Sequence, residues 1–393
     1  MTRLDSPFTA EQAAAHWQRA RKNFACIALV LQGGGALGSY QAGVYEAMAE
    51  AGVHPDWVAG ISIGAINAAI IAGNAPEERV EKLRGFWQSI TNNPLLDWVL
   101  VSEHLTPRGD MARGMFNQAS AALALAGGAS NFFSPRRPGP SFQPAGTLEA
   151  TSFYDTKALK GTLERFVDFD RINHRDGMHL SVGAVNVRTG NFTYFDNKQQ
   201  VIRPEHVMAS GSLPPGFPAT EIDGELYWDG GLISNTPLQW VLDRDKPQDT
   251  LVFQIDLWSA RGDVPATIEQ VMTRQKEIQY SSRTRAGTDQ FRRVQRMRYA
   301  LATLMEKLPA DLQDSEEATL LRAVAERKKY NLVHLIYRSR RYEGNSKDYE
   351  FSRLTMNEHW LAGFQDAVLT LKHPKIYEAP NNVEGVHVFD LVK

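Results

Sequence analysis

Two short apolar runs near the start of the chain each pass through glycine directly into a helical pattern. Residues 27–31 are all apolar and lead into Gln-Gly-Gly-Gly, after which residues 38–51 repeat apolar side chains at helical spacing. A second run, residues 57–60, leads into the small and apolar residues 63–72. Continuous apolar runs of this length are typical of strands buried on both faces of a parallel sheet. Two strand–helix units in succession therefore predict an α/β fold with right-handed crossovers.

The same alternation continues along the chain. Further helices are expected over residues 77–90, 156–166, 266–308, 315–329 and 357–371, with a short one over 207–212. Strands are expected over residues 225–228, 250–257 and 331–337, and the turn at 188–191 joins residues 178–187 and 192–195 into a hairpin.

One long segment, about residues 94–151, interrupts this order. It contains an apolar stretch, residues 111–125, expected to be helical, followed by a region rich in proline and arginine. Insertions of this length are usually functional or mobile. Two interpretations stay open: a surface excursion packed on the domain, or a lid or acyl-chain wall over a site.

Composition excludes several classes of protein. The net charge of -2 over 393 residues gives no overall field that would recruit nucleic acid or an anionic membrane. The single cysteine, Cys26, rules out an intrachain disulfide and lies in an apolar run, so we expect it to be buried. Residues 1–23 are polar and lack the apolar core of a secretory signal, and no stretch has the apolar length of a spanning helix. The expected location is the cytoplasm, with peripheral membrane contact left open.

The segment with the clearest chemistry is residues 60–64, which read Gly-Ile-Ser-Ile-Gly between an expected strand and an expected helix. In a nucleophile elbow, a serine sits on such a turn with its hydroxyl exposed. Gly60 and Gly64 would let the backbone bend where a side chain would clash. The N-terminus of the following helix would lie beside any developing negative charge. Ser62 is therefore a candidate nucleophile.

A serine nucleophile needs a base, and the histidines offer no convincing one. His179, His334 and His359 fall within expected strands or helices and are interpreted as structural. Asp229 follows the strand at 225–228 and precedes two glycines, which would let its side chain project from the strand end. Desolvation near Ser62 would raise its pKa and make it a better base. The alternative is that Asp-Gly-Gly is only a turn.

Residues 33–38 read Gly-Gly-Gly-Ala-Leu-Gly, between the first expected strand and its helix. Such a loop presents N–H groups that could stabilise the oxyanion formed during ester hydrolysis. The pattern also matches a dinucleotide-binding loop, but the residues 58–60 that end the next strand include no acidic residue, and the loop lacks the lysine of a Walker motif. The adjacent serine elbow favours the oxyanion interpretation.

Taken together, the glycine loop, the serine elbow and Asp229-Gly230-Gly231 resemble the patatin-like phospholipase family in order and spacing. The segments 209–218 and 235–238 resemble those that flank the aspartate strand in that family. The resemblance covers about residues 27–257. The tail, with residues 348–352 and a final helix, is similar to that of a bacterial subgroup with its own C-terminal extension.

This resemblance implies a three-layer α/β/α fold with a mainly parallel central sheet and helices on both faces. It implies a catalytic domain over residues 24–260, including the insertion, and a mainly helical extension over 261–393 packed on the same domain. It also implies a Ser–Asp dyad, Ser62 as nucleophile and Asp229 as base, that cleaves esters of phospholipids or other acyl lipids through an acyl-enzyme. The expected oxyanion-hole residues are Gly33, Gly34, Gly35 and Ile63, and the remaining motif glycines are Gly38, Gly60, Gly64, Gly230 and Gly231.

No cofactor and no metal are expected, the partner is an acyl lipid or ester substrate, and the oligomeric state is left open. Many family members carry arginine or lysine within the glycine loop, where this chain has Ala36 and Leu37. Two other functions remain as alternatives: an acyltransferase that uses the same acyl-serine, and a non-catalytic binding protein. The hypothesis of membrane contact rests on aromatic residues of the insertion, namely Trp98, Phe116, Phe132 and Phe133.

Overall fold

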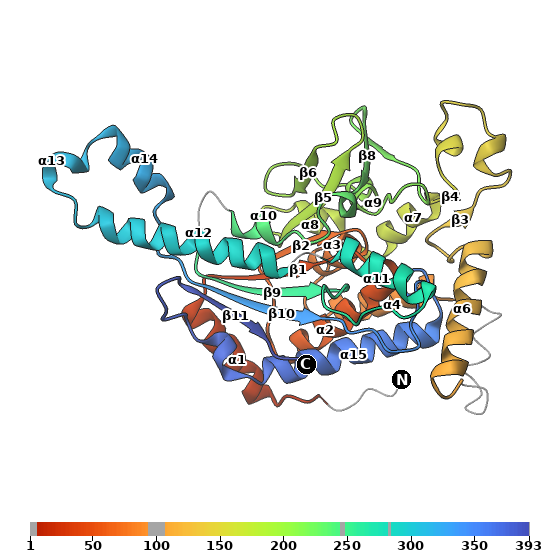
Figure 1. Cartoon of the computed structure of the whole chain (residues 1–393), viewed down its shortest axis with the longest axis horizontal. Helices are drawn as coiled ribbons and strands as arrows, with labels where there is room; N and C mark the ends of the chain where they lie inside the picture. Colours follow the sequence, from red (N-terminus) through yellow and green to blue (C-terminus); the bar gives the residue numbers. More distant parts are fainter. Residues whose placement is uncertain (1–5, 93–106, 244–247, 282–283, 393) are drawn as a thin grey trace.

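The structure is a computed structural model that describes residues 6–92, 107–243, 248–281 and 284–392. Its centre is a nine-stranded sheet with the strand order β11-β10-β9-β1-β2-β5-β8-β7, and β6 also pairs with β5 (Figure 1). The strands of this sheet are β1 (Cys26–Leu31), β2 (Trp57–Ile61), β5 (His179–Asn186), β6 (Phe192–Asp196), β7 (Thr220–Ile222), β8 (Glu225–Asp229), β9 (Thr250–Asp256), β10 (Tyr330–Ile336) and β11 (Val386–Asp390). The predicted α/β architecture with a mainly parallel sheet is confirmed, because the strands from β11 to β5 in this order are all parallel.

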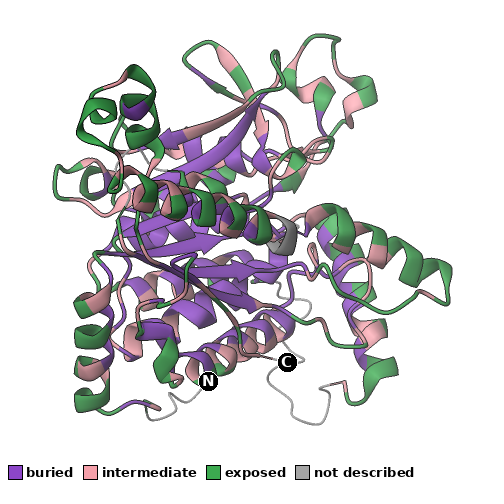
Figure 2. Ribbon diagram, turned by 60° about the vertical axis from the view of Figure 1, so that its left-hand side comes forward, coloured by how far each residue is buried: buried purple, intermediate pink, exposed green. Residues whose placement is uncertain are grey.

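The residues of β1 show why the sheet is covered on both faces. Ile27, Leu29 and Leu31 belong to one hydrophobic cluster, and the alternate residues Cys26, Ala28 and Val30 belong to another. Side chains of successive strand residues point to opposite faces, so each cluster lies on its own side of the sheet. Figure 2 shows the central strands buried, and β1, β2 and β9 are buried along their whole length, whereas the outer helices are buried only on their inner sides.

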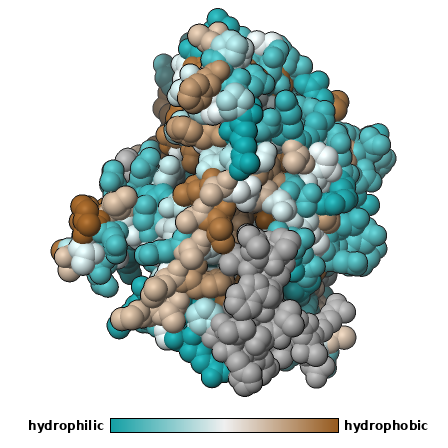
Figure 3. All heavy atoms as spheres, turned by 90° about the vertical axis from the view of Figure 1, so that its right-hand side faces the viewer, coloured by the Kyte–Doolittle hydropathy of each residue, from teal (hydrophilic) through white to brown (hydrophobic). Residues whose placement is uncertain are grey.

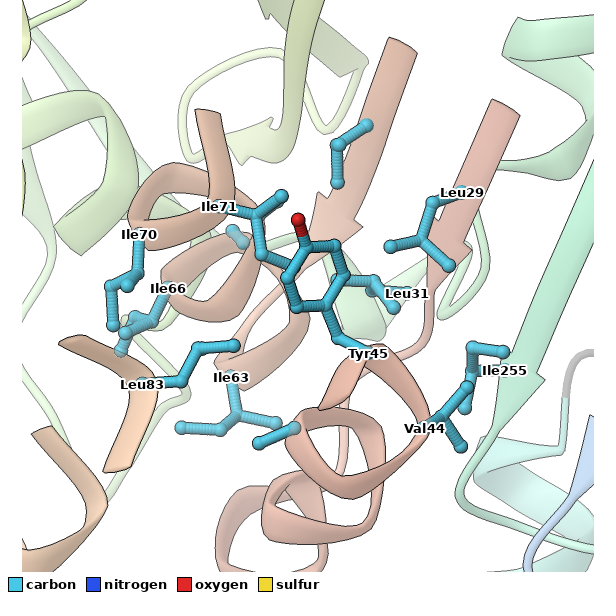
Figure 4. Close-up of a cluster of buried hydrophobic side chains, with 14 of the residues drawn as sticks. Leu29, Leu31, Val44, Tyr45, Ile63, Ile66, Ile70, Ile71, Leu83 and Ile255 are labelled. Carbon is cyan, nitrogen blue, oxygen red and sulfur yellow. The ribbon is translucent and has the colours of Figure 1, made fainter. Parts of the chain in front are cut away.

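The larger cluster packs helices against one face of the sheet. Figure 4 shows part of it, where Leu29 and Leu31 of β1 approach Tyr45 and the isoleucines of α3. The helices that contribute to this cluster include α1 (Ala10–Asn23), α2 (Ser39–Glu50), α3 (Ile63–Ala72), α4 (Arg79–Ile90), α7 (Lys157–Phe166), α8 (Phe169–Asn173), α9 (Pro204–Ser210) and α15 (Arg353–Leu371). The smaller cluster receives side chains from α10 (Leu238–Leu242) and α12 (Thr284–Met305). The result is a three-layer arrangement.

The C-terminal part of the chain differs from the expectation in two ways. The long helix expected over 266–308 is two helices, α11 (Ile268–Tyr280) and α12, and the helix expected over 315–329 is only α14 (Glu316–Val324), preceded by α13 (Ala310–Gln313). The extension over 261–393 also adds β10 and β11 to the central sheet, beside β9. The central sheet therefore contains strands from both sides of residue 260.

The insertion is described from residue 107 onward, and Trp98 lies outside the described residues. Its apolar stretch forms α6 (Asp110–Gly127) at one end of the molecule (Figure 1). The chain then forms a two-stranded sheet, β3 (Ser134–Pro135) with β4 (Tyr154–Asp155), around two 3₁₀ turns, Pro140–Phe142 and Leu148–Thr151. Within the described residues, no helix is long and apolar enough to span a membrane.

Candidate active site

Ser62 lies at the sharp turn between β2 and α3. Its φ of 55° and ψ of -125° are unusual for a residue with a side chain, a strain that nucleophile elbows typically show. A Cβ atom on Gly60 would collide with the carbonyl of Gly64, and one on Gly64 would collide with the carbonyl of Leu31. Both glycines are therefore needed, because the backbone crosses itself too closely for any side chain.

A buried serine from another helix holds the elbow in place. Ser210, at the end of α9, accepts a hydrogen bond from the Ser62 N–H at 2.9 Å and donates one to the Gly183 carbonyl at 2.6 Å. Ser210 is fully buried. This bridge connects the elbow to β5 and also means that the Ser62 N–H is not available to a ligand.

The sheet register brings Asp229 to Ser62. Strand β5 pairs with β6 along one edge, so β2 and β8 share its other edge. Ile61 of β2 is in register with Gly183, and Asp229 of β8 is in register with the next residue, Ala184. Because β8 runs antiparallel, the carboxyl ends of β2 and β8 meet head to head.

The Asp229 carboxyl group is buried beside the serine. The Ser62 hydroxyl lies beside it at the same cavity, and Asp229 Oδ1 accepts a hydrogen bond from the Gly231 N–H at 2.7 Å. Burial raises the pKa of Asp229 to about 7, although the neighbouring Ser62 hydroxyl and the Gly231 N–H act in the opposite direction. A Cβ on Gly230 would lie 2.8 Å from the Gly183 carbonyl, so glycine is needed where the chain leaves β8.

The glycine loop follows β1 at the same edge of the sheet. The Gly33 carbonyl accepts hydrogen bonds from Asn235 Nδ2 and Trp258 Nε1, both at 3.0 Å, while its N–H donates to the Asn235 carbonyl at 3.2 Å. Gly33 is thus held on both sides. Its N–H, one of the four expected oxyanion donors, already has a partner.

Within the part of the chain that the structure describes, the N–H groups of Gly34, Gly35 and Ile63 have no hydrogen-bond partner. Gly35 has a φ of 54°, and a Cβ there would collide with the carbonyl of Asp348. The next residue, Ala36, donates its N–H to that same carbonyl at 2.8 Å. Gly38 lets the start of α2 approach Ile63, since its Cβ would lie 2.5 Å from the isoleucine side chain.

Ser62, Asp229 and the loop glycines line one cavity of about 300 Å³. Its walls are largely apolar and come from distant parts of the chain, namely Leu125, Phe132 and Phe133 of the insertion, Tyr154 of β4, Leu213 to Phe217 after α9, and Trp258, Tyr280, Asp348, Tyr349 and Phe351 of the C-terminal part. We refer to it as the serine cavity. The insertion therefore forms part of its wall.

The described histidines lie elsewhere. His179 is at the start of β5, in register with Trp57 at the other end of β2 from Ser62, and its Nε2 is 2.7 Å from Asp196. His334 and His359 are buried in β10 and α15. None of the described histidines lines the serine cavity, and the described residues contain no cluster of side chains suited to holding a metal ion. Cys26 is buried in β1, as expected.

Several residues of the site were not singled out from the sequence. Ser210 and Asn235 belong to segments that the resemblance had marked, but their roles depend on tertiary contacts. Gln32 was not predicted either, although its Oε1 accepts hydrogen bonds from the N–H groups of Leu257 and Trp258. Its position just before the glycine loop was the only signal in the sequence.

Comparisons with known proteins identify the family of the chain. Residues 29–242 match the sequence profile described as Patatin-like phospholipase, and residues 278–383 match one described as Patatin phospholipase. A search among curated proteins finds no significant match. A search of solved structures returns the crystal structure of VipD from Legionella pneumophila, with a TM-score of 0.37 and 14% identity, over 93% of this chain and 72% of that one. From the family profile, which covers more than half of its length, the chain belongs to the patatin-like phospholipase family, and this membership supports lipid acyl hydrolysis as its general activity.

Proposed function

We propose that the protein hydrolyses carboxylic esters of phospholipids or other acyl lipids through an acyl-enzyme on Ser62, with Asp229 as the base. The observation that carries this proposal is the placement of the buried Asp229 carboxyl group beside the Ser62 hydroxyl, at an apolar cavity beside unpaired N–H groups. A nucleophile, its base and oxyanion donors are the minimum that acyl transfer needs.

In the first half of the reaction, Asp229 accepts the Ser62 proton as Oγ attacks the ester carbonyl carbon. The oxyanion that forms is stabilised by the N–H groups of Gly34, Gly35 and Ile63, together with the positive end of α3. The tetrahedral intermediate then collapses, the bond to the alcohol breaks, and the alcohol leaves with the proton from Asp229. Water, activated by Asp229, releases the acyl group by the same steps.

The electrostatics of the site support this role for the carboxylate. An aspartate with an ordinary pKa near 4 is a weak base at neutral pH. Burial raises the pKa of Asp229 to about 7, which is close to the value at which a general base is most effective near neutrality. No histidine is then required between the serine and the carboxylate.

The test uses Ser62→Ala and Asp229→Asn, assayed on short and long acyl esters and on phospholipid, with Ser141→Ala as a matched control at an exposed serine. We expect both site variants to lose hydrolysis and the control to keep it. A fluorophosphonate probe should label Ser62 in the native protein. Retained hydrolysis in both site variants would rule out the dyad. If the acyl group is transferred faster to an added alcohol or thiol than to water, the protein is an acyltransferase. If the probe does not label Ser62 in folded protein, a non-catalytic binding role is favoured.

We also propose that the outer surface of α6 contacts the lipid surface that carries the substrate. After Asp110, the only charged residue of this helix is Arg113, which is buried and paired with Glu358. Its exposed side carries Met111, Met115, Leu123 and Leu125. Figure 3 faces the end of the molecule where α6 lies and shows hydrophobic residues gathered on it.

This surface is continuous with the serine cavity, because Leu125 is half exposed and also lines the cavity. Two of the aromatic residues expected to contact the membrane lie inside instead, since Phe132 and Phe133 are buried. The double variant Met111→Asp/Met115→Asp should reduce flotation with phosphatidylcholine vesicles while leaving hydrolysis of a soluble short ester unchanged. Val264→Asp, at a residue that is 92% exposed on another segment, is the control. Unchanged flotation of the double variant would contradict this role of α6.

A further inference from the structure

A second cavity, of about 470 Å³, lies directly behind the wall of the serine cavity. It is bounded by the end of α4, the last two turns of α6 and the turn that follows α6. Two residues, Phe133 and Phe351, line both cavities. The second cavity therefore begins where the serine cavity ends, and two aromatic side chains separate them.

The wall is formed by packed rings from two distant segments. Phe133 follows α6 and Phe351 precedes α15, and their ring centroids are 5.8 Å apart in an edge-to-face arrangement. Phe132 and Phe217 complete the cluster, with centroids 5.9 Å from Phe351 and 5.2 Å from Phe133, respectively. Aromatic side chains that meet edge to face can move apart at a modest cost, equivalent to a factor of up to about ten in an equilibrium.

The turn after α6 is shaped to place Phe133 in this wall. Gly128 has a φ of 86°, and a Cβ there would collide with the Phe133 carbonyl. The Ala129 N–H donates to that carbonyl at 3.0 Å, and the Phe133 N–H donates to the Ala129 carbonyl at 3.1 Å. This tight loop returns the chain so that Phe133 points between the two cavities.

The chemistry of the second cavity suits hydrocarbon. Among its described lining residues, none is charged. Several of its polar side chains are already satisfied by the protein: Thr91 donates to the Trp87 carbonyl, Ser130 to the Asn92 carbonyl and Asn131 to the Ser89 carbonyl. With these donors engaged, and with Ile90, Leu123 and Ala124 on the same walls, the cavity offers apolar contact more than specific hydrogen bonding.

The serine cavity alone is at the lower limit of the volumes that hold drug-sized ligands. A long acyl chain attached to Ser62 would fill it and meet the wall of Phe133 and Phe351. Resting on the function proposed above, we infer that these two side chains form a gate, and that the second cavity receives the distal methylene groups of a long acyl chain bound at Ser62. The gate would then set the acyl-chain-length preference.

The test measures kcat/KM for single-chain nitrophenyl esters from butyrate to palmitate, which contain no second acyl chain. Phe133→Ala and Phe351→Ala should each raise the ratio of palmitate to butyrate hydrolysis by up to about tenfold, since the rings no longer need to be displaced. Gly127→Trp should lower the same ratio by narrowing the second cavity. A Cβ at Gly127 meets nothing within 4 Å, so the larger side chain can enter without disturbing the core.

The expected loss in Gly127→Trp is about fourfold for each methylene group excluded, from the free energy of burying one methylene. Gly139→Trp is the matched control, because its Cβ position is equally open and it lines neither cavity. Hydrolysis of butyrate by Gly127→Trp and Gly139→Trp, neither of which lies on the serine cavity, reports folding and an intact dyad, and urea denaturation reports the folding of Phe133→Ala and Phe351→Ala. Butyrate hydrolysis that survives Ser62→Ala would refute the proposed function itself.

With Ser62-dependent hydrolysis established, an unchanged length profile in all three cavity variants would overturn the gate. A change seen only with two-chain lipids would overturn it as well, because the second cavity would then receive the other chain of the substrate. The Gly127→Trp variant keeps the test decisive even if removal of a buried ring impairs folding.

Discussion

The replacement Asp229→Asn should stabilise the protein at neutral pH while abolishing hydrolysis. Asparagine has nearly the shape of a protonated aspartate, its Oδ1 can accept the Gly231 N–H, and its Nδ2 can donate to Ser62 Oγ. It differs in that it never becomes charged in this buried place. The native carboxyl group must ionise to act as a base, and the folded protein resists that ionisation.

The size of the effect follows from linkage between proton binding and folding. The pKa of Asp229 is raised from an ordinary 3.8 to about 7, so between about pH 4 and 7 the folded protein holds a proton that the unfolded chain has released. The free energy of unfolding therefore falls as the pH rises through this window and stays at the lower value above it. At 1.36 kcal/mol for each pKa unit, the full effect is about 4 kcal/mol.

Urea denaturation of the native protein and Asp229→Asn at pH 5 and pH 8 would measure it. The advantage of the variant should be roughly 2 to 3 kcal/mol larger at pH 8 than at pH 5, because the unfolded carboxyl is already mostly ionised at pH 5. The other titratable groups are the same in the native protein and in the variant, so their contributions to the free energy of unfolding cancel when the two are compared at the same pH. Asp263→Asn, at an exposed aspartate, provides a control that should show no such dependence. An advantage that does not change with pH would refute a raised Asp229 pKa, and with it the account of how a lone aspartate acts as base.

Three further outcomes follow from the same site. The kcat/KM for a short ester should rise with pH through a single limb near pH 7, because ionised Asp229 is the active form; a flat profile between pH 5 and 8 would contradict this. Gly35→Ala should lose most hydrolysis and about 1–2 kcal/mol of stability or more, since its φ of 54° disfavours a side chain and its Cβ would collide with the Asp348 carbonyl; normal turnover would show that the loop is not fixed there. Ser210→Ala should lower the free energy of unfolding by about 1–3 kcal/mol in urea denaturation, and it should lower kcat more than it changes KM, because the buried Ser62 N–H loses its acceptor. Activity equal to that of the native protein would mean that the turn at Ser62 keeps its conformation without this hydrogen bond.

The parts of the site that could be predicted from the sequence depend on local geometry. The turn at Ser62 needs glycine at position 60, because a side chain there would collide with the carbonyl of Gly64, four residues later. Glycine at position 64 is needed because of a more distant segment, the Leu31 carbonyl at the end of β1. The strand–helix alternation of the first ninety residues predicts β1, α2, β2 and α3 closely, since the buried strands are continuous apolar runs. Local constraints of this kind leave a visible pattern in the residues concerned.

Other features depend on contacts between distant segments and leave no such pattern. The edge strand β11 is only five residues long and only its first residue, Val386, is buried, so it lacks the apolar run that identifies β9. The break between α11 and α12 falls within a charged stretch whose spacing stays helical. The engagement of the Gly33 N–H follows from Asn235, about two hundred residues away. Because Asn235 accepts the Gly33 N–H, only three of the four expected oxyanion donors have no partner within the described residues.

The absence of a basic residue from the glycine loop has a structural counterpart in the C-terminal extension. Many family members carry a basic residue in this part of the loop. Leu37 is fully buried in the main hydrophobic cluster, so a basic side chain in its place would have to lose its hydration. The loop is instead held by the Asp348 carbonyl, which accepts the Ala36 N–H and passes close to Gly35.

The segment that provides this carbonyl is itself fixed by charge. Lys276 of α11 pairs with the Asp348 side chain at 2.5 Å and donates to the Asn345 carbonyl, and Lys347 pairs with Glu277 at 2.7 Å. Both lysines lie near the ring of Trp258, which lines the serine cavity. The basic groups near the oxyanion loop are therefore already neutralised by partners, and they position the loop's backbone instead of binding substrate. Under the mechanism proposed above, such a site would recognise the ester through main-chain N–H groups and apolar walls, and we expect it to select by acyl chain more than by a charged head group.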